Sequence, residues 1–172
     1  MRFARALAIA GVTFAGPASG AVRAATLPVP AGYPTIAAAI TAAAPGDTVL
    51  VATGTYLEHD IVLASGVGVL GESGDPRDVT IDAESKGRGF VSIDDDASTI
   101  LAGLTITHAF TTSHGGGLYG VRSDLVIADC HFVENRSANW GGGIAFPGDL
   151  VADDPALPLR AERGELRRWN VL

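Results

Sequence analysis

Three consecutive aspartates, Asp94, Asp95 and Asp96, form the densest group of acidic side chains in the sequence. Carboxylate oxygens are hard ligands of the kind that Ca²⁺ prefers. A run of this type is also typical of a solvated turn in an acidic protein. The sequence therefore suggests calcium as the one candidate cofactor, bound at these three residues. The alternative is that the three aspartates form an ordinary surface loop.

Side chains suited to covalent or acid–base catalysis are sparse. The chain contains no glutamine that could stabilise an oxyanion, and its single cysteine, Cys130, excludes an internal disulfide. Ser113 and His114 are neighbours, and adjacent residues of a strand point to opposite faces, so their spacing does not support a Ser–His–Asp triad. We therefore assign no catalytic residue.

Composition limits the classes of fold and partner. The chain has 172 residues, of which 47% are hydrophobic and 18% charged, so the bulk of it is not disordered. Its 22 glycines are spread among Val, Ile, Leu and Thr, which favours short strands joined by tight turns. A net charge of −7 makes nucleic acid an unfavourable partner. The sequence carries no signal for an oligomeric state.

The segment 1–24 has the pattern of a secretory signal peptide. Arg2 and Arg5 precede an apolar run over 6–16, and Pro17 and a stretch of small residues follow it. The run is shorter than the roughly 20 residues that span a bilayer, so we expect no transmembrane helix. We expect cleavage after Ala24, or alternatively after Ala21, and export to the cell surface, the outer membrane or the medium.

Short strands dominate the rest of the chain. An alanine-rich segment over 35–44, with Ile36 and Ile40 on one face, predicts a single short helix that ends at Pro45 and Gly46. Brief β-branched runs predict seven strands, over 48–51, 59–63, 67–70, 79–81, 90–93, 99–107 and 125–132.

An internal repeat sets the predicted architecture. Shifting the sequence by 26 aligns Leu104 with Cys130, Ile106 with Phe132, and the glycines over 115–117 with those over 141–143. A looser copy lies upstream, where the offsets are 25 and 28. This period, with no helix inside it, predicts an all-β solenoid of four or five coils over 25–148, capped by the N-terminal helix.

The repeat also predicts which side chains meet. Residues one repeat apart stand one above the other, so Leu104 and Cys130, and Ile106 and Phe132, should form core stacks. On the outside, His108 should lie over Glu134 and His114 over Trp140. The second pair would form a sugar-stacking strip with Tyr119, and all five residues are candidates for ligand binding. The alternative is that these five are ordinary residues of outward turns.

Turn residues repeat with the same period. We expect Asn135 at a corner that needs left-handed dihedrals, where its side chain can bond to backbone groups. The triplets Gly115, Gly116, Gly117 and Gly141, Gly142, Gly143 would allow positive φ and close backbone approach.

Two parts of the sequence resemble known families. Phe132-Val-Glu-Asn135 followed by Gly141-Gly-Gly-Ile144 resembles the FxxN and GGxI repeats of chlamydial polymorphic outer-membrane proteins. The stretch from Pro34 to Asp82 resembles the opening of pectinesterases and other pectin-lyase-like proteins. The resemblance implies a right-handed single-stranded parallel β-helix. It does not imply one activity, because this fold carries lyases, hydrolases, esterases and adhesins.

The end of the chain departs from the repeat. Residues 149–172 contain Pro155 and Pro158 where a ladder strand would stand, followed by clustered arginines. We expect either a C-terminal cap or, with preference, the product of a truncated or frame-shifted reading frame. The function that the sequence favours is a secreted or cell-surface module that faces polysaccharide or cell-surface glycan, or is adhesive, without a complete active site. The alternative is a truncated polysaccharide lyase, hydrolase or esterase.

Overall fold

The structure is a computed structural model, and it describes residues 23–146. One helix, α1 (Ile36–Ala42), accompanies fifteen short strands, which pair only in parallel in four sheets. The first sheet holds β1 (Thr26–Val29), β2 (Thr48–Val51), β5 (Gly68–Gly71), β8 (Ile100–Ala102) and β12 (Val126–Ala128). The second holds β3 (Gly54–Tyr56), β6 (Val79–Asp82), β9 (Thr105–Thr107) and β13 (His131–Val133). The third holds β4 (Ile61–Val62), β7 (Phe90–Ile93), β11 (Leu118–Val121) and β15 (Ile144–Ala145), and the fourth β10 (Phe110–Thr111) and β14 (Arg136–Ser137).

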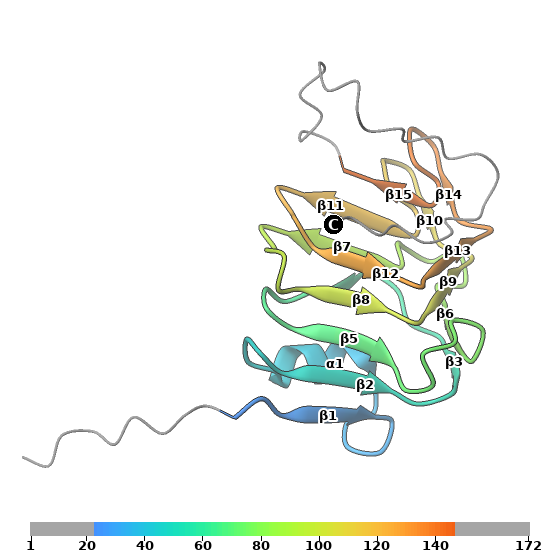
Figure 1. Cartoon of the computed structure of the whole chain (residues 1–172). Helices are drawn as coiled ribbons and strands as arrows, with labels where there is room; N and C mark the ends of the chain where they lie inside the picture. The colour runs from blue at the N-terminus through green and yellow to red at the C-terminus, as the bar shows by residue number, and fades with distance from the viewer. Residues whose placement is uncertain (1–22, 147–172) are drawn as a thin grey trace, which may run out of the picture.

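The chain visits these sheets in turn and so winds into a β-solenoid of about five coils (Figure 1). Coil 1 holds β1 and α1, coil 2 holds β2–β4, and coil 3 holds β5–β7. Coil 4 runs from β8 to β11 and coil 5 from β12 to β15. The predicted parallel solenoid with one short N-terminal helix is confirmed.

The strand register follows the predicted repeat. Ile106 pairs with Phe132, at the predicted offset of 26 in sequence number. Ile81 pairs with Ile106 at an offset of 25, and Phe90 with Leu118 at an offset of 28. Backbone hydrogen bonds between parallel strands therefore place the aligned residues side by side, and the differences in offset lie in the corners.

Two of the predicted strands are wrong as continuous elements. The run over 99–107 is β8 and β9, separated at Gly103, whose φ is +67°. The run over 125–132 divides in the same way into β12 and β13, and Asp129, with φ of +45°, occupies the equivalent corner. A single left-handed residue turns the chain there without a loop, so the apolar pattern continues across the bend.

Left-handed corners recur one above another in the ladder. His108 and Glu134 have φ of 51° and 56°, and Gly115 and Gly141 have φ of 65° and 69°. The expectation that Asn135 itself takes left-handed dihedrals is wrong, because the preceding Glu134 does so. Asn135 instead joins two coils: its Oδ1 accepts from the Ala109 amide at 2.9 Å, and its Nδ2 donates to the Ile106 carbonyl at 2.9 Å.

The glycine triplets provide positive φ and close backbone approach, except at Gly143, where a Cβ would meet only Phe132 at 3.5 Å. Gly115 and Gly141 supply the positive φ, and the next glycines supply close approach. A Cβ on Gly116 would lie 2.5 Å from the carbonyl oxygens of Arg136 and Gly142, which leaves no room for any side chain.

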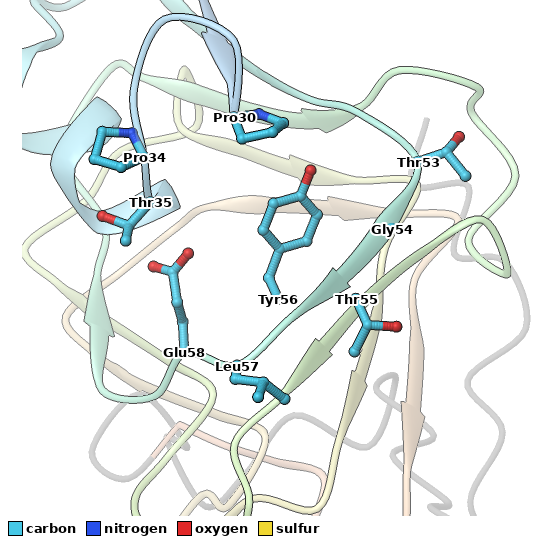
Figure 2. Close-up of a pocket in the computed structure, with 9 residues that line it drawn as sticks. All are labelled: Pro30, Pro34, Thr35, Thr53, Gly54, Thr55, Tyr56, Leu57 and Glu58. Carbon is cyan, nitrogen blue, oxygen red and sulfur yellow. The ribbon is translucent and has the colours of Figure 1, made fainter.

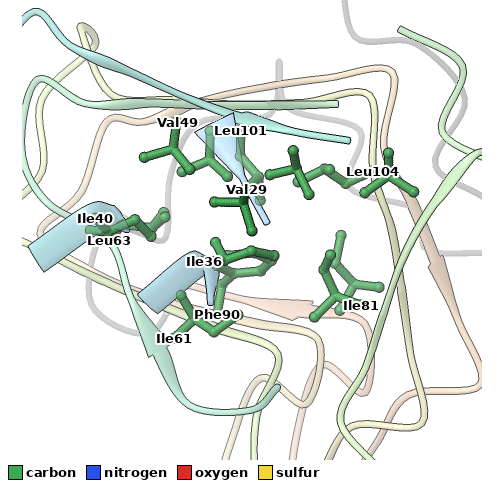
Figure 3. Close-up of a cluster of buried hydrophobic side chains, with 14 of the residues drawn as sticks. Val29, Ile36, Ile40, Val49, Ile61, Leu63, Ile81, Phe90, Leu101 and Leu104 are labelled. Atoms are coloured by element: carbon green, nitrogen blue, oxygen red, sulfur yellow. The ribbon is translucent and has the colours of Figure 1, made fainter. Parts of the chain in front are cut away.

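The core consists of side chains stacked along the solenoid axis. One stack runs through Tyr56, Ile81, Ile106 and Phe132, and the predicted pair Leu104 and Cys130 is also buried. Figure 3 shows Ile36 and Ile40 of α1 among core side chains that come from the strands. The helix packs against β1, β2 and β4, and so covers apolar surface in the first coils.

The start of α1 is fixed by two side chains. Thr35 Oγ1 accepts from the Ala38 amide at 3.1 Å, as an N-cap residue does. Glu58, from the corner after β3, accepts from the Ile36 and Ala37 amides at 2.8 and 3.1 Å. A carboxylate there also interacts favourably with the helix dipole.

The expected signal peptide lies almost entirely, and the expected tail over 149–172 entirely, outside the described residues. Within residues 23–146, no helix has the length and apolar character needed to cross a membrane.

Replacement of Phe132 by alanine tests the core register. Because Phe132 is 4% exposed and stacks on Ile106, Phe132→Ala should lower the free energy of unfolding by roughly 3–5 kcal/mol. Urea denaturation followed by circular dichroism measures this loss. The control, Phe110→Ala, removes an aromatic ring that is 41% exposed and should change stability far less. An equal denaturation midpoint for Phe132→Ala and the wild type would contradict the register.

Candidate functional site

Three of the predicted ligand-binding residues lie, together with an arginine, on and beside the corners that precede the third sheet. We call Arg88, His114, Tyr119 and Trp140 the Trp140 strip. Arg88 precedes β7 in coil 3, His114 precedes β11 in coil 4, and Trp140 precedes β15 in coil 5. Tyr119 lies on β11, beside Val91 of β7 and Ala145 of β15.

Arg88 is held in a fixed position within the strip. Its guanidinium carbon lies 4.7 Å from the centre of the Tyr119 ring, a cation–π geometry. Its Nε donates to the His114 carbonyl at 3.1 Å, and its own amide donates to Asp60 Oδ1 at 3.0 Å. The guanidinium is therefore oriented across two coils before any ligand arrives.

The predicted proximity of His114 and Trp140 is confirmed. Their ring centres are 5.9 Å apart and the planes meet at 81°, an edge-to-face contact. Trp140 is 78% exposed, the highest fraction among the exposed large hydrophobic residues of the described chain. Ser113 Oγ lies 3.2 Å from His114 Nδ1, and within residues 23–146 no carboxylate completes this pair into a triad.

The predicted proximity of His108 and Glu134 is also confirmed, and a third residue joins them. His108 Nε2 lies 2.9 Å from Glu134 Oε2, while His108 Nδ1 lies 3.0 Å from Asp82 Oδ2. We call these three the His108 bridge. Asp82, His108 and Glu134 belong to coils 3, 4 and 5, so one imidazole connects three successive coils.

The two carboxylates change the ionisation of the bridge. The hydrogen bond with Asp82, and then that with Glu134, raise the pKa of His108 above its ordinary value. Burial opposes ionisation of Asp82, but hydrogen bonds from the Glu84 amide and from His108 outweigh it and lower the pKa of Asp82. The bridge therefore favours an imidazolium between two carboxylates.

The three consecutive aspartates point to different partners. Asp94 forms a bidentate ion pair with Arg122, at 2.5 and 2.8 Å. Asp95 is 4% exposed and accepts from Ser92 Oγ at 2.5 Å. Asp96 accepts from the amide of Ser98 at 2.9 Å and also from its hydroxyl. In residues 23–146, no group of three histidine, cysteine or acidic side chains is placed to hold a metal ion.

Asp95 belongs to a buried polar cluster that the sequence does not reveal. Ser92 Oγ contacts both Asp95 and the hydroxyl of Ser123, and all three residues are buried. Ser92 faces the interior because it alternates with the outward Val91 and Ile93 on β7. The cluster ties the corner after β7 to the corner after β11, which is a structural role.

A shallow hollow of about 460 Å³ lies at the start of the solenoid. Figure 2 shows the Tyr56 hydroxyl turned toward Pro30 and the Glu58 carboxylate turned toward Thr35. Tyr56 donates to the Ala52 carbonyl at 2.9 Å, and burial raises its pKa, so the phenol stays a donor at neutral pH. Because Glu58 is already bound to α1, the charged group of this hollow stabilises the first coils rather than awaiting a ligand.

Cys130 does not have the properties of a nucleophile. Burial raises the pKa of its thiol to about 12, and the sulfur lies 3.5 Å from the Leu101 carbonyl. The reactive form of cysteine is the thiolate, which this environment disfavours.

Comparisons of the chain with protein-family models, with curated proteins and with solved structures found no match.

The separate partners of the three aspartates predict the response to calcium. We expect 5 mM Ca²⁺, roughly the concentration that saturates weak extracellular sites, to leave the melting temperature unchanged. Differential scanning calorimetry measures this, with Mg²⁺ at equal concentration as the control for ionic strength. A rise in melting temperature that is specific to Ca²⁺ and disappears in Asp96→Asn would contradict the prediction.

Proposed function

We propose that this protein is a secreted or cell-surface β-helix module that binds an extended glycan along the Trp140 strip. The observation that carries the proposal is the exposed Trp140 ring, which meets His114 edge-to-face beside the Arg88–Tyr119 pair. We further infer that the coils are of the right-handed pectin-lyase-like type with FxxN and GGxI repeats. The roles of Phe132, Asn135 and the two glycine triplets in stacking the coils support that inference.

The chemistry of the strip matches that of a sugar. A pyranose has a face of C–H groups that packs on the negative face of an aromatic ring, and a rim of hydroxyls that needs hydrogen bonds. Trp140 offers the ring, and Arg88 and His114 offer polar groups beside it. Neighbouring coils are about 4.8 Å apart. Arg88, His114 and Trp140 belong to three successive coils, so they follow a line along which an extended polymer can lie.

Binding fits the described residues better than catalysis does. The Ser113–His114 pair lacks an acidic partner within residues 23–146, and the buried Cys130 is held as a thiol. The competing proposal is a polysaccharide-degrading enzyme whose catalytic residues lie outside the described coils. The two differ in whether bound polysaccharide is cleaved.

Trp140→Ala tests the proposed binding surface. If the ring supplies stacking, the variant should bind polysaccharide about tenfold more weakly, equivalent to ~1.4 kcal/mol. Affinity electrophoresis against a panel of soluble neutral and uronate-containing polysaccharides measures retardation and the dissociation constant. Phe110→Ala is the matched control, since Phe110 is an exposed aromatic residue outside the strip.

Two results would contradict the proposal. One is equal retardation of the wild type and Trp140→Ala by every polysaccharide that is bound, and the other is the absence of retardation by the whole panel. Release of reducing or unsaturated sugar ends by the wild-type protein would favour the enzyme instead.

A further inference from the structure

We infer that the His108 bridge is a pH-sensitive clamp that holds coil 5, the coil that carries Trp140, onto coils 3 and 4. The clamp is defined by two hydrogen bonds on opposite nitrogens of one ring, to Asp82 at 3.0 Å and to Glu134 at 2.9 Å. Both bonds join residues 26 positions apart in the chain.

The protonation state of the imidazole decides how many of these bonds exist. An imidazolium carries N–H groups on both nitrogens and donates to both carboxylates. A neutral imidazole carries one N–H, so one carboxylate then faces a lone pair. Loss of the proton therefore breaks one of the two links and leaves two negative charges beside a neutral ring.

Of the charged groups near the ring, the two carboxylates that contact it favour its charged state, and together they outweigh the opposing effect of burial. Asp82, the last residue of β6, contacts the ring directly, while in the corner that follows Glu84 and Lys86 pair with each other at 2.7 Å. From the corner after β13, Glu134 contacts the ring, and Arg136 is the basic residue two positions on. The pKa of His108 is accordingly raised, first by Asp82 and then by Glu134.

The raised pKa of His108 determines how the clamp responds to pH. A group whose pKa is higher in the folded state contributes its full stability below its ordinary pKa and loses it as pH rises through the higher value. The clamp is therefore closed in mildly acidic solution and weakens toward alkaline pH.

Within the described residues, coil 5 is where such a clamp has most effect. Strands β5–β9 of coils 3 and 4 have paired neighbours on both sides, whereas β12, β13 and β14 of coil 5 pair on one side only within the described residues. Its apolar residues Ile127 and Ile144 are half-buried, while Leu101 and Leu118 in coil 4 are fully buried. A coil with fewer paired strands opens more readily. One side-chain link therefore supplies a larger share of its stability against opening.

A consequence for binding rests on the proposed function. Trp140 lies in coil 5 and its contact partner His114 lies in coil 4, so loosening of coil 5 separates the two rings. Glycan binding should then weaken as pH rises. The clamp itself does not depend on any ligand.

The experiment uses the whole chain without glycan, so its failure leaves the proposed function untouched. An NMR titration of the His108 ring should give a midpoint above the ordinary histidine value of about 6.5 in the wild type. Glu134→Gln keeps the size of the side chain and removes its charge, and should move the midpoint down. His59→Gln removes a histidine that pairs with the adjacent Asp60, outside the His108 bridge, so it is the control and should leave the His108 midpoint in place. An unchanged midpoint in Glu134→Gln would overturn the inference.

Amide hydrogen exchange tests whether the bridge acts on coil 5. After correction for intrinsic rates, a rise from about pH 5 to about pH 8 should reduce protection of β13 and β14 by roughly two- to fivefold, the range for an exposed ion pair. In His108→Gln this pH-dependent component should disappear. The same pH dependence in His108→Gln and in the wild type would overturn the clamp.

Discussion

Parallel backbone hydrogen bonding between successive coils is the constraint on which the rest of this structure depends. Once Phe132 pairs with Ile106, every other residue of coil 5 has a fixed neighbour in coil 4. These backbone hydrogen bonds do not involve side chains. Chemically unrelated residues are therefore brought together whenever they lie one repeat apart. The core stacks, the contact of His114 with Trp140 and the bond of His108 with Glu134 are three results of the same register.

The register also places corner residues of successive coils next to one another. Left-handed residues recur at matching positions, and such conformations cost about 1 kcal/mol or more for residues other than glycine. The protein has histidine, glutamate, aspartate and arginine at several of these corners, although glycine would cost less. At the corner of His108 and Glu134 the two side chains hydrogen bond to each other, and Asp94 and Arg122 form an ion pair at another. Side-chain pairing between coils thus offsets part of the backbone cost.

Sequence patterns predicted the features that depend on the repeat alone. The helix, the offsets between paired strands, the core pair of Ile106 and Phe132 and the glycine roles all follow from aligned residues. The division of the run over 125–132 into β12 and β13 could not be predicted. A single left-handed aspartate, Asp129, turns the chain there and leaves no gap in the apolar pattern. The bond from Glu58 to α1 and the contact of Arg88 with Tyr119 join residues that are not one repeat apart, so alignment does not reveal them.

The contact between the rings of His114 and Trp140 requires the coil register described above, and the Trp140 strip is built on the same contact. A nuclear Overhauser spectrum of the isotope-labelled chain, with Trp140→Phe to assign the indole signals, measures that contact. We expect cross-peaks between protons of the His114 ring and protons of the Trp140 ring, because the two ring centres are 5.9 Å apart. Cross-peaks from Trp140 to residues of coil 2 or coil 3, with none to His114, would contradict the register and remove the Trp140 strip with it.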